Sequence, residues 1–276
     1  SIMDKNFWHT IKENKYAFPQ GHDLTALTDE LFSYIPSTDP DLRDGIGYEI
    51  FANWIETEPY QAEQLRGYLK RLLENLQVGL GQQDDDSVFG RAFSVLYLAE
   101  VIHRDNQQPY LESHEVKETL TRVLAYLAAE RDPRGYVPVK GWAHALAHTA
   151  DMLMVFARSP HLGATELEHI LSAVSEKMRA AKNWIYIHGE DDRLARAIVT
   201  ALAREELSLE QVKAWFENLT TDWKGAWDHE EQSRAYLNAR NLLRAIHLRI
   251  LQMKELPRQE ELSALALEAA ASMRPF

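Results

Sequence analysis

Apolar residues recur at spacings of three and four along almost the whole chain, which is the period of an α-helix. Strand-like runs are confined to residues 136–139 and 184–187, and both are too short to build a sheet. The pattern predicts an all-α protein with no significant sheet and with helices over residues 4–14, 22–35, 39–57, 60–78, 86–105, 112–130, 141–158, 163–181, 190–204, 208–218, 229–252 and 257–273.

Alternate helices of this set begin at a regular interval. The third, fifth, seventh, ninth and eleventh begin near residues 39, 86, 141, 190 and 229, close to the roughly 40–47 residues of two-helix repeats. We therefore predict a curved array of antiparallel helix pairs, an α-solenoid of the HEAT or armadillo kind. A closed helical toroid and an irregular bundle are the alternatives. Because no long Gly, Ser or Pro linker interrupts the chain, we expect a single domain over residues 3–276.

Composition narrows the class of protein. The chain has 12 glycines and 10 prolines in 276 residues and no cysteine, which favours long helices and excludes disulfides and thiolate chemistry. A net charge of −12 argues against nucleic acid and anionic membranes as partners. The N-terminus lacks a basic region followed by an apolar run, and no stretch reaches about 20 apolar residues. We expect a cytoplasmic protein.

The strongest local feature is the segment from Gly141 to Asp151, in which His144, His148 and Asp151 form a polar stripe on an otherwise apolar helix. Buried polar groups need partners. Three alternatives are open: a structural hydrogen-bond network, a small-molecule or peptide site, and a divalent metal site that uses these three side chains as ligands. We expect no tightly held metal and no other cofactor.

A second feature is the segment 41–54, where Gly45 and Gly47 interrupt an apolar helical period. Each weakens a helix by about 1 kcal/mol relative to alanine. The two glycines therefore indicate either close packing against another helix or access of a ligand to the backbone. Asp44 and Tyr48 share one face of this segment and are candidate binding residues.

The third feature is the run Asp84-Asp85-Asp86 followed by Arg91 in an apolar helix. The acids are expected to lie at the helix N-terminus, where the helix dipole favours negative charge. Arg91 is either a buried ion-pair donor or an anion clamp, and we favour the ion pair.

The polar candidates lie on alternate helices, and alternate helices of a stacked array line one face. We therefore expect them to converge on one groove. These candidates are Asp44, Tyr48, Arg91, His144, His148, Asp151, Arg193 and Asn238.

The residues of these segments resemble a bacterial family described as domain of unknown function 2785. The resemblance extends from about residue 39 to about residue 244, and the stretch from Arg134 to Asp151 is its most specific part. The usual Arg-Ser-Phe-Ser of the family has Ala92 at its second position here. The resemblance implies a cytoplasmic, all-helical protein and supplies no reaction.

Two function classes follow from the residues. The first is a binding module whose polar groove takes a small molecule, a peptide or a partner protein. The second is a metal-assisted hydrolase or lyase in which His144, His148 and Asp151 hold a divalent ion that activates water. Phosphate-binding loops, G-x-S-x-G elbows and H-E-x-x-H pairs are missing from the sequence, and whether the protein is an enzyme is left open.

Overall fold

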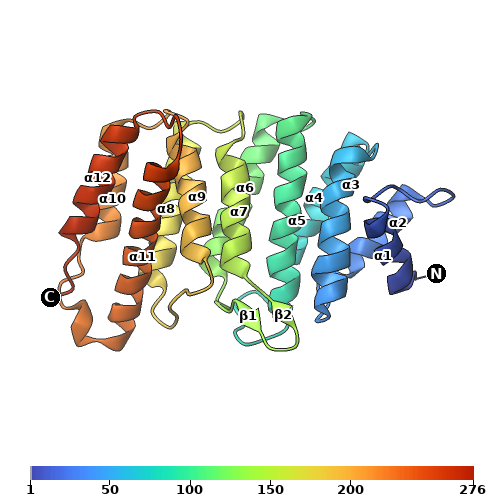
Figure 1. The fold of residues 1–276 in the computed structure, drawn as a ribbon, viewed down its shortest axis with the longest axis horizontal. Coiled ribbons are helices and arrows are strands. Elements are labelled where there is room, and N and C mark those ends of the chain that lie inside the picture. Colours follow the sequence, from blue (N-terminus) through green and yellow to red (C-terminus); the bar gives the residue numbers. More distant parts are fainter. Residues whose placement is uncertain (1) are drawn as a thin grey trace. The chain divides into compact units, whose positions relative to one another are not determined.

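A computed structural model describes residues 2–276, which are mostly helical (Figure 1). This part of the chain contains twelve α-helices, a π-helical segment, a 3₁₀ helix and one two-stranded sheet. In chain order the elements are α1 (Lys5–Glu13), α2 (Leu24–Ser33), η1 (Asp41–Tyr48, the π-helix), α3 (Glu49–Thr57), α4 (Ala62–Asn75), α5 (Ser87–Gln107), α6 (Ser113–Ala129), β1 (Tyr136–Val137), β2 (Gly141–Trp142), α7 (Ala145–Ala157), α8 (Ala164–Ala180), α9 (Glu190–Leu202), α10 (Leu209–Thr220), η2 (Ala226–Asp228, the 3₁₀ helix), α11 (Glu230–Gln252) and α12 (Gln259–Ser272).

The all-α class is confirmed, and each predicted helix has a counterpart. At some helix starts a side chain accepts a hydrogen bond from a free backbone N–H group. The side chain of Asp23 accepts from Ala26 N at 2.8 Å before α2, and Ser208 forms a reciprocal capping box with Gln211 before α10, at the predicted start.

Two predicted helices differ from the structure. The helix expected over 39–57 begins as a π-helix, η1, and becomes regular only at Glu49. The helix expected over 141–158 begins at Ala145, because Gly141 and Trp142 pair with Val137 and Tyr136 in an antiparallel hairpin. The second strand-like run, 184–187, forms no strand.

The chain divides into two compact units. The first contains the chain up to Glu112 together with Ala129–Met152, and the second contains Ser113–Ala128 together with Leu153–Phe276. Each unit is described by itself below. The single domain expected from the sequence stays a prediction.

The first unit is built on α5, which packs against η1, α3 and α4. Aromatic rings fill this core: Phe51 stacks on Tyr97 with 4.8 Å between ring centroids, and Phe32 meets Tyr97 edge-on at 5.3 Å. Trp54 is fully buried, and its indole N–H donates to the Tyr16 carbonyl oxygen at 2.8 Å. Because these rings pack closely, the polar side chains of η1 and α5 have fixed directions.

The second unit is built on α11, which packs against α8, α9 and α12. Its inward face is apolar and includes Leu242, Leu243, Ile246 and Ile250. Among residues 2–276 there is no helix with the length and apolar character needed to cross a membrane.

Candidate functional site

The π-helix η1 carries the first group of candidate residues. A Cβ atom on Gly47 would lie 2.9 Å from the Leu42 carbonyl oxygen and 2.9 Å from the Tyr97 hydroxyl. The packing explanation for this glycine is therefore confirmed. π-Helical turns are rare and are frequently found at functional sites. Here the turn fixes Asp44 and Tyr48 beside α5.

Tyr48 is the centre of a group of half-buried acids that we call the carboxylate stripe: Asp44 on η1, Glu100 on α5 and Asp151 on α7. The Tyr48 hydroxyl donates to Glu100 Oε1 at 2.6 Å. Burial raises the pKa of Tyr48 well above its usual value, and the negative charges of Glu100, Asp151 and Asp44 raise it further. Three acids from three alternate helical elements thus act on one phenol.

Two acids of the stripe lack a cationic partner. Within residues 2–276, Asp44 forms no ion pair or side-chain hydrogen bond, and Glu100 has the Tyr48 hydroxyl alone. Burial raises the pKa of Asp44, and the negative charge of Glu49 raises it further. The positive charges of Arg43 and Lys12 lower it by less. Burial also raises the pKa of Glu100. The hydrogen bond from Tyr48 and the nearby His103 lower it, but by less. Both carboxylates are therefore held in surroundings that disfavour their charge.

We expect Asp44→Asn to stabilise the protein at neutral pH by about 0.5–2 kcal/mol, the range typical of single stabilising substitutions. The pKa of Asp44 is higher in the folded chain than its usual 3.8, so ionisation opposes folding. The gain should be present near pH 7 and vanish as the pH falls below about 3.8, where both states are protonated. Urea denaturation of both proteins across this range measures it. A gain that is constant with pH would contradict the charge argument.

His144 lies before α7 and not within it. Its carbonyl oxygen accepts from His148 N at 2.9 Å, as in an N-cap residue, and its φ is +60°. Its ring stacks on Trp142, with centroids 4.7 Å apart, and lies 5.9 Å from the His148 ring. The expectation that both histidines belong to one helix is therefore wrong, because the chain leaves the hairpin only at Ala145.

His148 has contacts typical of a structural residue. Its Nδ1 lies 3.0 Å from the Ala92 carbonyl oxygen, and its ring meets Phe93 edge-on at 4.8 Å. In the part of the chain that the structure describes, no three His, Asp or Glu side chains come together in a way that fits a metal ion. The ligand set that the metal alternative requires, His144, His148 and Asp151, is thus not assembled.

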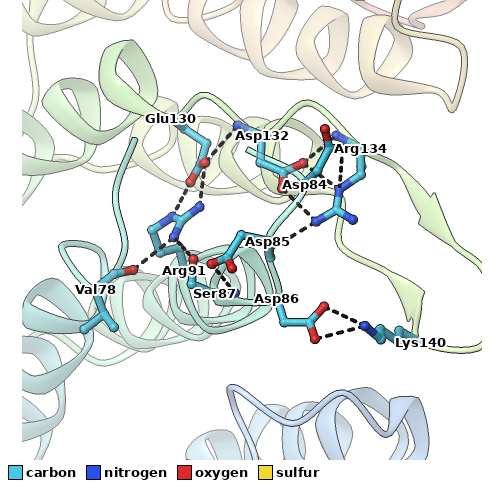
Figure 2. Close-up of polar contacts among 10 residues, drawn as sticks. All are labelled: Val78, Asp84, Asp85, Asp86, Ser87, Arg91, Glu130, Asp132, Arg134 and Lys140. Atoms are coloured by element: carbon cyan, nitrogen blue, oxygen red, sulfur yellow. Dashed lines mark hydrogen bonds and ion pairs between the residues drawn. The ribbon is translucent and has the colours of Figure 1, made fainter. Parts of the chain in front are cut away.

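Arg91 lies at the centre of the ion-pair network in Figure 2. Its guanidinium donates to both carboxylate oxygens of Glu130, at 2.6 and 2.9 Å, and to the Val78 carbonyl oxygen and the Ser87 hydroxyl. The side chains of Arg91 and Glu130 are 0% and 6% exposed. The buried ion pair that we favoured for Arg91 is confirmed.

The acidic loop before α5 is tied to the 130–140 segment (Figure 2). Arg134 forms a bidentate ion pair with the Asp132 carboxylate and donates to the Asp85 carbonyl oxygen at 3.1 Å. Lys140 Nζ lies 2.9 Å from both carboxylate oxygens of Asp86. The acids therefore fix the loop against the hairpin that carries Trp142.

Sequence reasoning missed Arg43. Its side chain is fully buried, and its guanidinium donates to the carbonyl oxygens of Ser37, Lys140 and Trp142. The aromatic faces of Phe89 and Phe93 lie 4.2 and 4.9 Å from its central carbon. Burial lowers the pKa of Arg43 to about 10, which leaves it charged at neutral pH.

Glu100 was missed as well, although a signal was present. Between Ser87 and Ile102, α5 has two charged residues, Arg91 and Glu100. They are nine residues apart, which places them on opposite sides of the helix. Arg91 faces Glu130, and Glu100 faces Tyr48.

The two remaining candidates belong to the second unit. Asn238 accepts from Tyr186 N at 3.0 Å and donates to the carbonyl oxygens of Ala181 and Trp184, so it braces the loop before α9. Arg193 lies half-buried on α9. In the first unit the charges of Asp44 and Asp151 both raise the pKa of Tyr48, and the rings of His144 and His148 lie 5.9 Å apart. One groove for all eight candidates stays a prediction.

Comparison with known proteins identifies the family. Residues 76–248 match the family model described as "Protein of unknown function (DUF2785)". No curated protein and no solved structure matches the chain. The matched region includes Arg91, Glu100 and the whole segment from Glu130 to Asp151, and it spans more than half of the 276 residues. The chain belongs to the DUF2785 family.

Proposed function

We propose that the chain is a binding module and that its carboxylate stripe binds an organic cation, an ammonium or guanidinium group. The observation that carries the proposal is the pair of half-buried carboxyls, Asp44 and Glu100, with raised pKa values and no cationic partner within residues 2–276. A fold retains such groups at a loss of stability, and groups of this kind concentrate at functional sites. A bound cation would compensate both charges.

The neighbourhood of the stripe favours an organic cation over a metal ion. The half-buried Tyr48 ring is the aromatic face beside the acids, and the fully buried Tyr97 ring lies 6.0 Å behind it. Aromatic faces attract ammonium and guanidinium groups, and carboxylates pair with them. The metal-assisted alternative lacks a favouring observation, since no metal-ligand trio is assembled among the described residues.

The expected stack of helix pairs in a cytoplasmic protein forms part of this proposal. Such an array presents alternate helices to a ligand. The stripe draws its acids from η1, α5 and α7, which correspond to the third, fifth and seventh predicted helices. This agreement supports a groove along that face of the first unit.

Calorimetry with two sets of cationic probes tests the proposal. Agmatine and spermidine represent free small molecules, and short blocked Gly-Arg-Gly and Gly-Lys-Gly peptides represent a side chain of a partner. We expect one set to bind, with an affinity that falls as salt is added and falls by about tenfold in Asp44→Asn and in Glu100→Gln, which corresponds to about 1.4 kcal/mol. The set that binds identifies the source of the cation.

Glu63→Gln is the matched control, since it removes one negative charge from an exposed position on α4 of the same unit. Its affinity should equal that of the wild type. Absence of binding by every probe, or an equal loss in Glu63→Gln, would refute the proposal. Misfolding does not confound the result, because Asp44→Asn is expected to be the more stable protein.

A further inference from the structure

The hairpin of the first unit exposes three large apolar side chains, which we call the hairpin tip: Tyr136, Val139 and Trp142. They are 53%, 91% and 40% exposed. Tyr136 and Trp142 are directly opposite in the strand register, and their rings meet edge-on at 5.2 Å. Exposed aromatic residues that form a contiguous patch mark interaction surfaces more often than isolated ones do.

The hairpin tip is held in one conformation by contacts at its base. The buried Arg43 guanidinium bonds the carbonyl oxygens of Lys140 and Trp142, at 2.6 and 3.0 Å. The backbone N–H of Ala143 donates to the Gly135 carbonyl oxygen at 2.8 Å. Such a tip loses little conformational freedom when a partner binds, which favours affinity.

The backbone of the tip is also strained. Val139 has a φ of +69°, a conformation that β-branched residues rarely adopt. Its side chain is almost wholly in solvent, so packing within the chain does not explain a valine there. Strain of this kind concentrates at functional sites. The exposed valine therefore points to a partner that contacts it.

The charge beside the tip indicates the chemistry of this partner. Asp84, Asp85 and Asp86 are exposed and lie along the hairpin segment (Figure 2). The side chain of Asp84 is 84% exposed, whereas that of its partner Arg134 is 17% exposed. Lys140, 40% exposed, and Arg134 offset two of the four acids here, Asp84, Asp85, Asp86 and Asp132. The loop therefore keeps a surplus of negative charge, beside aromatic faces that attract cations.

We propose that the hairpin tip and the loop Asp84–Asp86 form a docking site for a basic peptide segment of a partner protein. Apolar or arginine side chains of the segment pack on Tyr136, Val139 and Trp142, and its basic side chains lie against the acids. A second copy of the chain is disfavoured as occupant, because two chains of net charge −12 repel each other. The inference goes beyond the proposed function and does not depend on the stripe.

Fluorescence anisotropy with labelled synthetic peptides tests the docking site. The probes are short peptides that alternate leucine with arginine or lysine, and the same peptides with glutamate at the basic positions. We expect the basic peptides to bind and the glutamate peptides not to bind. Added salt should weaken the binding of the basic peptides. Trp142→Ala should weaken binding about tenfold or more, as truncation of an aromatic anchor does. Val139→Lys should weaken it by charge repulsion.

Matched variants separate the patch from general effects. Trp227→Ala removes a tryptophan that is 48% exposed in the second unit and should leave affinity unchanged. Val139→Asn suits the left-handed backbone and introduces no charge, so it should bind more tightly than Val139→Lys. Trp142→Ala should lower the affinity by the same factor in the wild type and in the Asp44→Asn background, which separates this site from the stripe.

Three results would overturn the inference: no binding of the basic peptides by the wild type, equal binding of the glutamate peptides, or equal losses in Trp142→Ala and Trp227→Ala. The Val139 variants guard against misfolding, because that side chain makes no contribution to the core.

Discussion

Glu130→Gln is expected to lower the free energy of unfolding by about 3 kcal/mol, since removal of one partner of a buried ion pair leaves the other charge uncompensated. The charge left behind is that of Arg91, whose side chain is 0% exposed. The Val78 carbonyl oxygen and the Ser87 hydroxyl would still accept its hydrogen bonds, but neither carries a charge. Urea denaturation gives the difference.

An exposed pair supplies the control. Asp29→Asn makes the same chemical change in a pair with Arg71 whose side chains are 52% and 46% exposed. Pairs of this kind contribute about 0–1 kcal/mol. The double variant Arg91→Met/Glu130→Leu, which removes both charges, should recover much of the loss. Equal effects of Glu130→Gln and Asp29→Asn would contradict the assignment of this pair to the buried class.

The helices were predictable because each buries one apolar face, and the spacing of those faces is visible in the sequence. The hairpin was not predictable from that spacing. Gly141-Trp142-Ala143 is apolar and reads as the first turn of a helix. The segment does not begin a helix, because Gly141 has a φ of +79° and because the Trp142 carbonyl oxygen accepts a hydrogen bond from Arg43, almost one hundred residues earlier. The spacing of apolar residues within a segment gives no information about a hydrogen-bond donor so far away in the sequence.

The candidate site was predictable in part, for a similar reason. Asp44, Tyr48 and Asp151 stood out as polar residues on apolar elements, and the charges of both acids raise the pKa of Tyr48. Glu100 completes the stripe through a 2.6 Å hydrogen bond from Tyr48 on another element. Likewise the ion pair of Arg91 was expected, but its partner Glu130 is 39 residues away in the sequence. Residue type indicates that a partner exists, and only the fold identifies it.

Arg43→Lys is expected to lower the free energy of unfolding by about 2–4 kcal/mol and to loosen the hairpin. The planar guanidinium reaches Ser37 O with one nitrogen and both hairpin carbonyl oxygens with another. A lysine ammonium is a single point charge and cannot reproduce this geometry. Each lost hydrogen bond to a charged group is worth about 1.5–3 kcal/mol, part of which one retained bond offsets.

Two measurements check this expectation. Urea denaturation gives the global loss, and hydrogen exchange at the Ala143 and His144 amides reports the hairpin, since these N–H groups bond the Gly135 and Arg134 carbonyl oxygens. Lys140→Met is the control within the hairpin. This substitution removes the ion pair with Asp86, in which the Lys140 and Asp86 side chains are 40% and 50% exposed. Its effect on stability should therefore stay below about 1 kcal/mol. If both amides keep their protection in Arg43→Lys, the guanidinium does not hold the hairpin. The rigidity assigned to the exposed tip would then have to come from the chain around Gly135.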